Sequence, residues 1–471
     1  MINGTKQLNA MNTGTDRRSF IKTSAGWLGF CLLPGIFRIA LPEPTEKFYR
    51  FRAYRPGKTA APVQCITPDD GFYLHTFYNK CPWSPTQRYF AVTRLPYQKN
   101  KAQWGDTADV CVIDLQRQSI KTVYTTKAWG YQLGADLQWD NHSDRYLYTN
   151  DIIDGKAVCV RIDLQEHTAR AYTGAKYDLA PDNQSIISPN LLNMNMTQYG
   201  YSVPDPPSGK PVPFTKQQMP QEGLWKTDLA TDACSLLVPF PRFVEQAEHD
   251  KDFYGNAVLY LFHSQYNRQN TRILQVLRGQ VNNKGRNACL FSLNTDGTNI
   301  TQCLSREKWN YKTGAGGSGN HPNWHPDGEH VIMNCVPAWL GYKDMHFCRF
   351  RYDGSDFTVL SEKHLGSGHP SVEHTGRYLL ADAYPKQDYV VGANGEIPIR
   401  LLDLRHDDEQ VVCTIANDVG GHGAQYTEES RQQGGSGYKL DPHPVWSPDY
   451  KKIALNGAPD QRRQVFIAFL E

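Results

Sequence analysis

Two short phrases recur along this chain at propeller-like intervals, and this repetition constrains the fold more than any other feature of the sequence. In the first phrase, an aromatic or apolar residue precedes a turn rich in Pro, Asp or Gly and then a strand. Its copies begin at Cys81, Leu137, Tyr177, His321, His369 and His443. The flanking residues alternate apolar and polar side chains, as half-buried antiparallel strands do. The chain is therefore expected to be all-β.

The second phrase is a strand that ends near an acidic residue, followed by a turn and another strand. The acids of its copies are Asp114, Asp163, Asp228, Asp296, Asp353 and Asp403. An acidic side chain favours a turn because it accepts hydrogen bonds from backbone amides just ahead of it. Asp114 and Asp163 are 49 residues apart, and Asp353 and Asp403 are 50 apart. Kelch and WD propellers repeat at about this period.

These counts predict one seven-bladed β-propeller over residues 43–471. Six copies of the second phrase are complete, and a seventh first phrase starts at His443 near the end of the chain. That last blade lacks an outer strand, which residues 48–54 are expected to supply, closing the ring. Closure removes long open sheet edges. The ranges 190–222, 267–286 and 418–439 are expected to be irregular insertions, and no long amphipathic helix is expected.

Residues 1–42 have the pattern of an export signal and linker. Arg17 and Arg18 precede an apolar stretch over residues 24–37, as in bacterial twin-arginine signals. The stretch is short and interrupted by Gly and Pro, which is unfavourable for a spanning helix. An ordinary basic start and a lipoprotein site at Cys31 are the alternatives. We expect a periplasmic or secreted protein, without membrane association after signal removal.

Charge and cysteine usage narrow the possible partners. The 50 Lys and Arg residues nearly balance the 48 Asp and Glu residues, giving a formal charge of +2. This balance argues against nucleic-acid binding through bulk charge, yet it permits a local basic cleft for an acidic ligand. Eleven cysteines are present, and an exported protein can form disulfides. Cys111, Cys159 and Cys413 lie in apolar strands, where a buried free thiol is the favoured interpretation.

Three blades begin with a histidine at the same position of the first phrase: His321, His369 and His443. Equivalent positions on neighbouring blades converge in a propeller, and converging imidazoles are typical ligands of zinc or manganese. Asp441 lies two residues before His443 and would point to the same side of an extended strand. His263 ends a strand of the fourth blade and could complete the set. The alternative is that these His-Pro pairs only cap turns.

A second group of residues suits proton transfer on a uronate. The predicted catalytic residues are His142, Arg161, Tyr199 and Tyr201. β-Elimination needs a base for the proton beside the carboxylate and an acid for the departing glycosidic oxygen, roles that His and Tyr can fill. It also needs the carboxylate neutralised by arginine or a metal. The predicted substrate-binding residues are Arg272, Arg278 and His321.

Several of these phrases resemble known polysaccharide lyases. His321-Pro322-x-Trp324, Gly368-His369-Pro370 and the stretch 441–449 are similar to oligogalacturonate lyases, which are seven-bladed propellers with a histidine-rich manganese site. This resemblance implies that His369 and His443 bind the metal and that His321 lies near the catalytic centre. Asp441 stands where that family has a further histidine.

Other phrases resemble the propeller ulvan lyases. They are the stretch 77–96, Gly134-Ala135-x-x-Gln138-Trp139 and Gln198-Tyr199-Gly200-Tyr201. This resemblance implies that His142 is the catalytic histidine and that Tyr199 or Tyr201 is the catalytic tyrosine. Arg161 falls where those enzymes have a second histidine, and no residue matches their substrate-clamping arginine.

The sequence therefore predicts an exported lyase that cleaves a uronate-containing acidic polysaccharide, of the ulvan or pectin type, by β-elimination. A divalent metal, zinc or manganese, is its expected cofactor, and a monomer is its expected state. The alternative is a non-catalytic propeller, similar to periplasmic TolB, that binds glycans or proteins.

Overall fold

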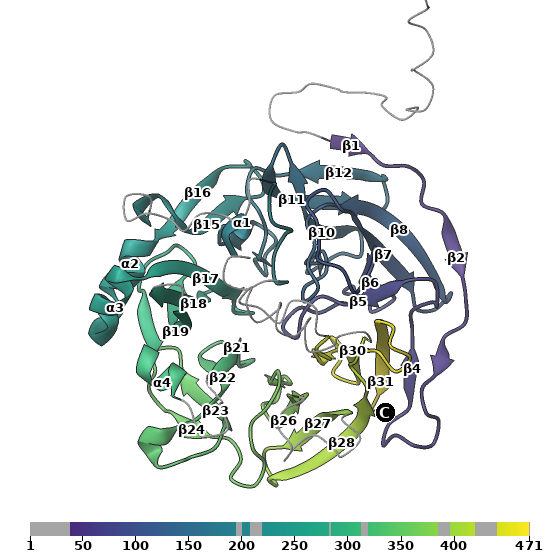
Figure 1. The fold of residues 1–471 in the computed structure, drawn as a ribbon. Coiled ribbons are helices and arrows are strands. Elements are labelled where there is room, and N and C mark those ends of the chain that lie inside the picture. The colour runs from purple at the N-terminus through teal and green to yellow at the C-terminus, as the bar shows by residue number, and fades with distance from the viewer. Residues whose placement is uncertain are drawn as a thin grey trace, which may run out of the picture.

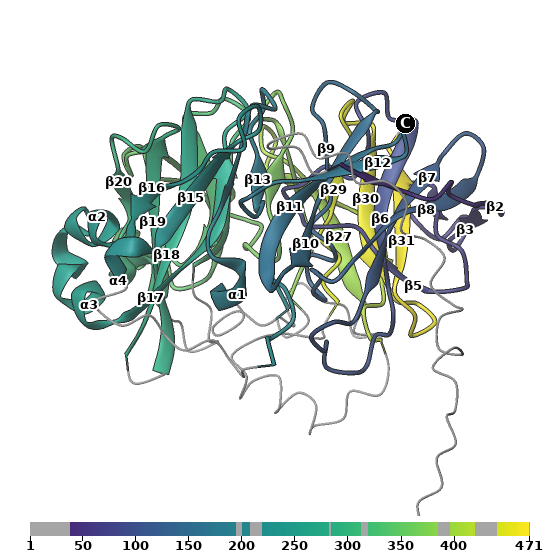
Figure 2. The same ribbon diagram turned by 90° about the horizontal axis from the view of Figure 1, so that it is seen from above.

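Seven antiparallel sheets surround a central channel in the computed structural model (Figure 1), which confirms the predicted seven-bladed propeller. The structure describes residues 38–194, 200–207, 219–281, 284–311, 319–384, 396–419 and 440–470, without the side chains of 284–286. In each blade the strands run between the two faces of a disc (Figure 2). Residues 1–37 of the predicted signal and linker, which span residues 1–42, lie outside the described part of the chain.

The first four blades follow one another around the ring. Blade 1 contains β5 (Phe72–Leu74), β6 (Tyr89–Leu95), β7 (Ala108–Asp114), β8 (Ser119–Thr126) and β2 (Glu46–Phe48). Blade 2 contains β9 (Gln138–Trp139), β10 (Tyr146–Ile153), β11 (Lys156–Asp163), β12 (Thr168–Ala171) and β1 (Arg38–Ala40). Blade 3 contains β13 (Asp178–Leu179), β14 (Ser185–Ser188), β15 (Gly223–Asp228) and β16 (Cys234–Pro239). Blade 4 contains β17 (Val258–Tyr266), β18 (Arg272–Val281), β19 (Lys284–Asn294) and β20 (Thr301–Leu304).

The remaining three blades complete the ring. Blade 5 contains β21 (Asn320–Trp324), β22 (His330–Cys335), β23 (His346–Arg351) and β24 (Thr358–Val359). Blade 6 contains β25 (Ser371–Val372), β26 (Tyr378–Ala381), β27 (Ile397–Asp403) and β28 (Asp408–Ile415). Blade 7 contains β29 (Val445–Trp446), β30 (Lys452–Gly457), β31 (Gln464–Phe469), β4 (Val63–Cys65) and β3 (Arg52–Ala53).

Helices are few and short, as the sequence predicted. They are α1 (Leu191–Met194), α2 (Phe240–Glu245), α3 (Lys251–Asn256), α4 (Arg306–Asn310) and the 3-10 turns η1 (Met219–Gln221), η2 (Glu248–Asp250) and η3 (Ala338–Leu340). Helices α2 and α3 lie on the outer side of blade 4 (Figure 1). In the part of the chain that the structure describes, no helix is both long and apolar enough to cross a bilayer.

The ring closes through the early part of the chain, but the closing strand differs from the predicted one. Strand β4 pairs with β31, with Cys65 opposite Phe466, and completes blade 7. The predicted segment 48–54 instead supplies β3, which pairs with the outer edge of β4. Strands β1 and β2 add fifth strands to blades 2 and 1. The residues before β5 thus run along the outer side of three neighbouring blades (Figure 1).

One predicted insertion is wrong, because residues 267–286 contain most of a long hairpin rather than irregular chain. Strands β18 and β19 pair from Arg272 opposite Asn294 outward to Val281 opposite Lys284. The polar residues of β18 obscured its alternation of apolar side chains. The other two predicted insertions are only partly described. The residues outside the described part of the chain are 195–199 and 208–218 in the first, and 420–439 in the second.

Apolar side chains pack between blades, and indole hydrogen bonds join some of them. Trp139 Nε1 donates to Pro82 O of blade 1 at 2.8 Å, and Trp324 Nε1 donates to Gln265 O of blade 4 at 3.2 Å. The ten cysteines of the described residues are free, and most are buried. This agrees with the interpretation of Cys111, Cys159 and Cys413 as small buried apolar residues.

Candidate metal centre in the central channel

Four histidines converge at the innermost strands of blades 4 to 7. His263 lies in β17, His321 lies in β21, and His369 and His443 each precede the innermost strand of their blade by two residues. The backbone is left-handed at His263 (φ 54°), His321 (φ 50°) and His443 (φ 47°). Residues other than glycine rarely adopt this backbone conformation, and those that do are concentrated at functional sites. Here it accompanies a shift of ladder register in β17 and β21.

Asp382 fixes the position of two of these histidines. Its carboxylate lies 2.9 and 3.1 Å from Nδ1 of His369, and it also accepts the backbone N–H of His369 at 2.8 Å and of His443 at 3.2 Å. With Nδ1 donating to Asp382, Nε2 of His369 presents a lone pair. This Nε2 is buried and has no hydrogen-bond partner among the described residues. A carboxylate behind an imidazole is the usual support of a metal-binding histidine.

The second and third candidate ligands lie beside that nitrogen. One ligand atom from each of His369, Asp441 and His443 lies within 4.8 Å of the other two, and all three residues are buried. Nε2 of His443 and Oδ2 of Asp441 are 3.9 Å apart. Two imidazoles and one carboxylate are a common donor set for zinc, manganese and iron. These residues fit the predicted divalent metal, so the structure supports the metal interpretation over simple turn capping.

His321 forms one wall of this centre. Its ring stacks on His369 with centroids 3.8 Å apart, and its Nδ1 lies 2.8 Å from Gly368 O and 2.9 Å from the Tyr384 hydroxyl. Gly368 itself has a left-handed backbone (φ 62°), and a Cβ there would lie 2.2 Å from Asp382. His321 and Tyr384 are half-buried, whereas the three candidate ligands are almost fully buried. His321 and Tyr384 are therefore the more exposed members of this group.

Aromatic residues from blade 1 form the opposite wall. Phe77 lies 4.6 Å from His443 and 5.3 Å from His263 between ring centroids, and Tyr78 lies 5.1 Å from His369 and 5.5 Å from His321. Burial raises the pKa of the Tyr78 phenol well above its ordinary value, so this hydroxyl stays protonated. It donates to Pro322 O at 3.0 Å. These rings enclose the imidazoles in an apolar setting.

His263 and Arg278 extend the group on the blade 4 side. Burial lowers the pKa of His263 well below its ordinary value, and the positive charge of Arg278 lowers it further. The imidazole is therefore neutral at pH 7, and its Nδ1 has no partner among the described residues. Arg278 lies over the ring of Phe262 at 4.6 Å, and Tyr201 packs edge-on against the same ring at 5.2 Å. Two predicted residues, Arg278 and Tyr201, thus lie close to the histidines.

The other predicted catalytic residues are not brought to this centre. His142 is exposed in the turn after β9, at the end of the channel where the innermost strands finish, and its backbone N–H donates to Asp140 at 2.9 Å. Arg161 lies in β11 and stacks on Tyr146 of its own blade at 4.6 Å. Tyr199 lies outside the described residues. The structure therefore separates His142 and Arg161 from Tyr201.

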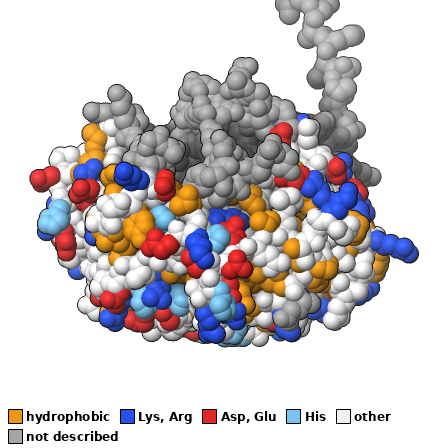
Figure 3. Space-filling model, turned by 90° about the horizontal axis from the view of Figure 1, so that it is seen from below, with side chains coloured by type: hydrophobic (Ala, Val, Ile, Leu, Met, Phe, Trp, Pro, Cys, Tyr) orange, Lys and Arg blue, Asp and Glu red, His pale blue; other side chains and the backbone are white. Residues whose placement is uncertain are grey.

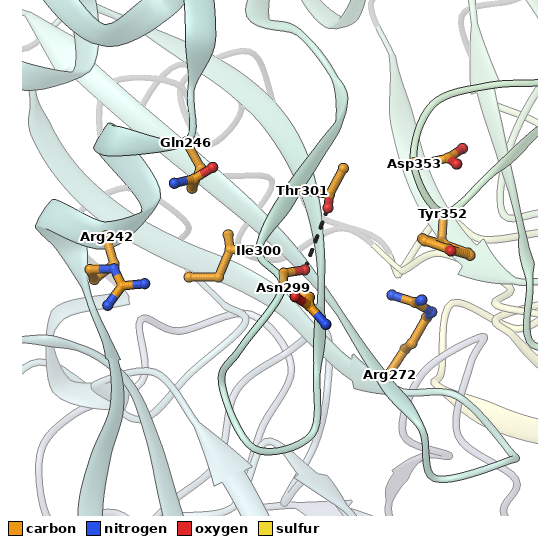
Figure 4. Close-up of a pocket in the computed structure, with 8 residues that line it drawn as sticks. All are labelled: Arg242, Gln246, Arg272, Asn299, Ile300, Thr301, Tyr352 and Asp353. Atoms are coloured by element: carbon orange, nitrogen blue, oxygen red, sulfur yellow. Dashed lines mark hydrogen bonds between the residues drawn. The ribbon is translucent and has the colours of Figure 1, made fainter.

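Arg272 lies in a separate pocket between blades 4 and 5. Its guanidinium is 3.3 Å from the ring centroid of Tyr352, and the pocket has a volume of about 540 Å³ (Figure 4). Arg242, Asn299 and Asp353 also line it. The described histidines of the channel are not among its lining residues, so a ligand at the histidine group would not meet Arg272.

Sequence reasoning missed Asp382, Tyr384, Phe77 and Tyr78. Asp382 could have been found from the hairpin of blade 6, because Ser371 pairs with Leu380, and extending that register outward places His369 opposite Asp382. Phe77 and Tyr78 lie in the loop between β5 and β6, and no periodic pattern marks a loop. Their role depends on blade 1 lying beside blade 7 and facing the other histidine-bearing blades across the channel.

On the side seen in Figure 3, the surface of the described residues has no large area of one charge sign. Acidic and basic side chains alternate there, as the formal charge of +2 suggests. Many of the cations are paired, for example Arg145 with Asp163 at 2.7 Å and Arg377 with Asp403 at 2.5 Å. A charged ligand would thus be attracted by a local site.

Comparison with solved structures supports the architecture. An oligogalacturonate lyase in complex with manganese is similar over 92% of this chain and 99% of that one, with a TM-score of 0.61 and 14% identity. An oligogalacturonate lyase from Vibrio parahaemolyticus is similar over 91% of this chain and 99% of that one, with a TM-score of 0.59 and 13% identity. TolB from Acinetobacter baumannii reaches a TM-score of only 0.36 at 9% identity, too low to carry an argument. No protein-family model and no curated protein sequence matches the chain.

Proposed function

We propose that this propeller is an exported polysaccharide lyase that cleaves a uronate-containing polymer of the pectin type by β-elimination at the histidine group. The observation that carries the proposal is the buried set His369, Asp441 and His443 with its Asp382 support. A divalent cation held there would neutralise the uronate carboxylate and acidify the adjacent proton. The solved oligogalacturonate lyases of the same fold, one with manganese, support this assignment.

The residues around that set suit the proton transfers. His263 is kept neutral by burial and by Arg278, and a neutral imidazole with a free lone pair can accept the proton beside the carboxylate. The Tyr201 phenol, packed beside His263 against Phe262, is the proposed proton donor to the leaving oxygen. His321 and Tyr384, the more exposed members of this group, are the proposed contacts to the sugar.

The test is an elimination assay on purified protein supplied with manganese or zinc. The 4,5-unsaturated uronate product absorbs in the ultraviolet, so absorbance should rise with oligogalacturonate or pectate as substrate. His263→Ala should lower kcat by about 10²- to 10⁴-fold, the usual contribution of a general base. His374→Ala, which removes an exposed imidazole of blade 6, is the matched control and should leave the rate unchanged.

Two results would contradict the proposal. No rise with oligogalacturonate, pectate or ulvan would favour a non-catalytic glycan-binding propeller. A rise that is abolished by His142→Ala but not by His263→Ala would assign the elimination to the opposite mouth of the channel.

A further inference from the structure

Blade 4 has an arginine at the beginning of its second strand but lacks the carboxylate that pairs with such an arginine in other blades. In three blades, an arginine directly before the second strand pairs with the acid that ends the third strand. These pairs are Arg88 with Asp114 at 2.8 Å in blade 1, Arg145 with Asp163 at 2.7 Å in blade 2, and Arg377 with Asp403 at 2.5 Å in blade 6. In blade 4, β18 begins with Arg272, and β19 ends with the neutral Asn294 opposite it. The guanidinium of Arg272 makes no hydrogen bond or ion pair with a described residue.

Stacking on an aromatic ring of blade 5 holds this guanidinium in place. The central carbon of the Arg272 guanidinium lies 3.3 Å from the ring centroid of Tyr352, and Arg351 also lies over that ring at 5.0 Å. Stacking uses the face of a guanidinium, so the N–H groups in its plane stay available to an acceptor. Arg272 is only half-buried, so a ligand can reach these groups. A fixed guanidinium of this kind suits a carboxylate, which accepts two parallel hydrogen bonds from it.

The pocket beside this guanidinium, called the Arg272 pocket below, offers further hydrogen-bond donors. Its volume of about 540 Å³ is in the usual range of small-ligand sites. Arg242, Gln246 and Asn299 line it and are exposed. In the view of Figure 4, Asn299 lies between Arg242 and Arg272. The two amide side chains can bind the hydroxyls of a sugar, because an amide both donates and accepts.

The charges of the pocket favour an anion. Arg242 and Arg272 are the cations that line it, and Asp353 is the carboxylate. Oδ1 of Asp353 already accepts the backbone N–H of Ser355 at 3.0 Å and its hydroxyl at 2.6 Å. Arg242 pairs with Glu245 at 3.4 Å, but both side chains are more than half exposed, and such pairs are weak. An anionic ligand would supply the partner that Arg272 lacks, whereas a neutral one would leave its charge uncompensated.

We propose that the Arg272 pocket is a second glycan site, outside the channel, which binds a uronate residue of an acidic polysaccharide. Arg272 binds the carboxylate, and the amides of Gln246 and Asn299 contact the hydroxyls. The anion site follows from the pocket itself, whereas the identity of the anion as a uronate rests on the proposed function. None of the four channel histidines lines this pocket, so it holds the polymer and does not cleave it.

Calorimetric titration of the full-length protein at low ionic strength tests this proposal, with digalacturonate as the charged probe and galactobiose as the neutral one. All proteins in the titration carry His369→Ala, so that the proposed elimination does not consume the probe. Digalacturonate should bind, and galactobiose should bind at least about tenfold more weakly. Arg272→Ala should weaken digalacturonate binding by about tenfold or more, since a charge-assisted pair of hydrogen bonds is lost. Arg377→Ala is the matched control, because this arginine is paired with Asp403 in blade 6; affinity should not change.

A second variant removes the free charge without removing the arginine. Asn294→Asp restores the acid that blades 1, 2 and 6 have at this position. Residues directly opposite each other in a ladder project from the same face of the sheet, so the new carboxylate would pair with Arg272. Digalacturonate binding should then weaken by about tenfold, while the melting temperature shows that the fold is retained.

The outcome is distinguishable from that of the lyase assay. Absence of digalacturonate binding would overturn the proposal, and so would equal affinity for galactobiose. Unchanged digalacturonate affinity in both Arg272→Ala and Asn294→Asp would overturn it as well, even if the protein is an active lyase. Binding that depends on Arg272 in a protein without elimination activity would support this site and contradict the proposed function.

Discussion

At the scale of the residue, the candidate centre depends on one carboxylate that does not itself belong to the proposed ligand set. Asp382 holds the ring of His369 and the backbone of both His369 and His443. Gly368 leaves room for it, since a Cβ at that position would overlap its backbone oxygen and side chain at 2.2 Å. Asp382 therefore fixes the positions of His369 and His443 without being one of the proposed ligands.

Asp382→Asn tests this support. The amide is nearly isosteric, but it lacks the negative charge that fixes the tautomer and raises the basicity of His369. Loss of such a partner lowers metal affinity by about 10- to 100-fold, which calorimetric titration with manganese or zinc would measure. Asp403→Asn, a surface acid paired with Arg377, is the control and should bind metal normally. Equal affinity in the two variants would refute the supporting role.

At the scale of the element, the outer strands differ in what they contribute. Strand β4 is the fourth of the five strands of blade 7, and its Val63 is only 3% exposed. Strand β1 adds a fifth strand to an already complete blade, and its Ile39 is 41% exposed. Ring closure therefore depends on β4 more than on β1.

Val63→Ser should lower the free energy of unfolding by about 2 kcal/mol, because it removes buried apolar atoms and buries a hydroxyl. Ile39→Ser should change it by less than about 0.5 kcal/mol, as for exposed positions in general. Urea denaturation of both variants measures the difference. Equal destabilisation by the two substitutions would contradict the assigned roles of these strands.

At the scale of the whole molecule, the repeated turn acids make the ring sensitive to acid. Hydrogen bonds lower the pKa of Asp228, Asp296 and Asp403. In the others, Asp114, Asp163 and Asp353, burial raises the pKa but hydrogen bonds outweigh it, so that the net shift is also downward. All six acids of the second phrase therefore favour the ionised form in the folded state.

The sign of the pH effect follows from these shifts. Acids with a lowered pKa in the folded state contribute stability that is complete above their unfolded pKa of about 4 and is lost as pH falls through the folded values. The melting temperature should therefore be level near neutral pH and fall steeply below about pH 4. Asp114→Asn should make that fall shallower. A melting temperature that stays constant as the pH is lowered from about 6 to about 3 would contradict this account.

The architecture could be predicted from the sequence because the two phrases recur in several blades. The spacing of the acids and the tryptophan phrases indicated seven blades, and the same logic indicated that His369 and His443 meet. Asp382, Phe77 and Tyr78 escaped prediction since they come from a hairpin partner and a loop across the channel. His142 and Tyr201 could not be assigned to opposite ends of the channel by spacing alone, because spacing does not state which end of a strand a side chain occupies.

The most direct measurement is the metal content of the purified protein after incubation with manganese or zinc and removal of free ion. We expect one tightly held divalent ion per chain in the unaltered protein and its loss in His369→Ala and His443→Ala, with the fold retained by circular dichroism. A chain that holds no ion, or holds it equally well without both imidazoles, would contradict the proposed centre.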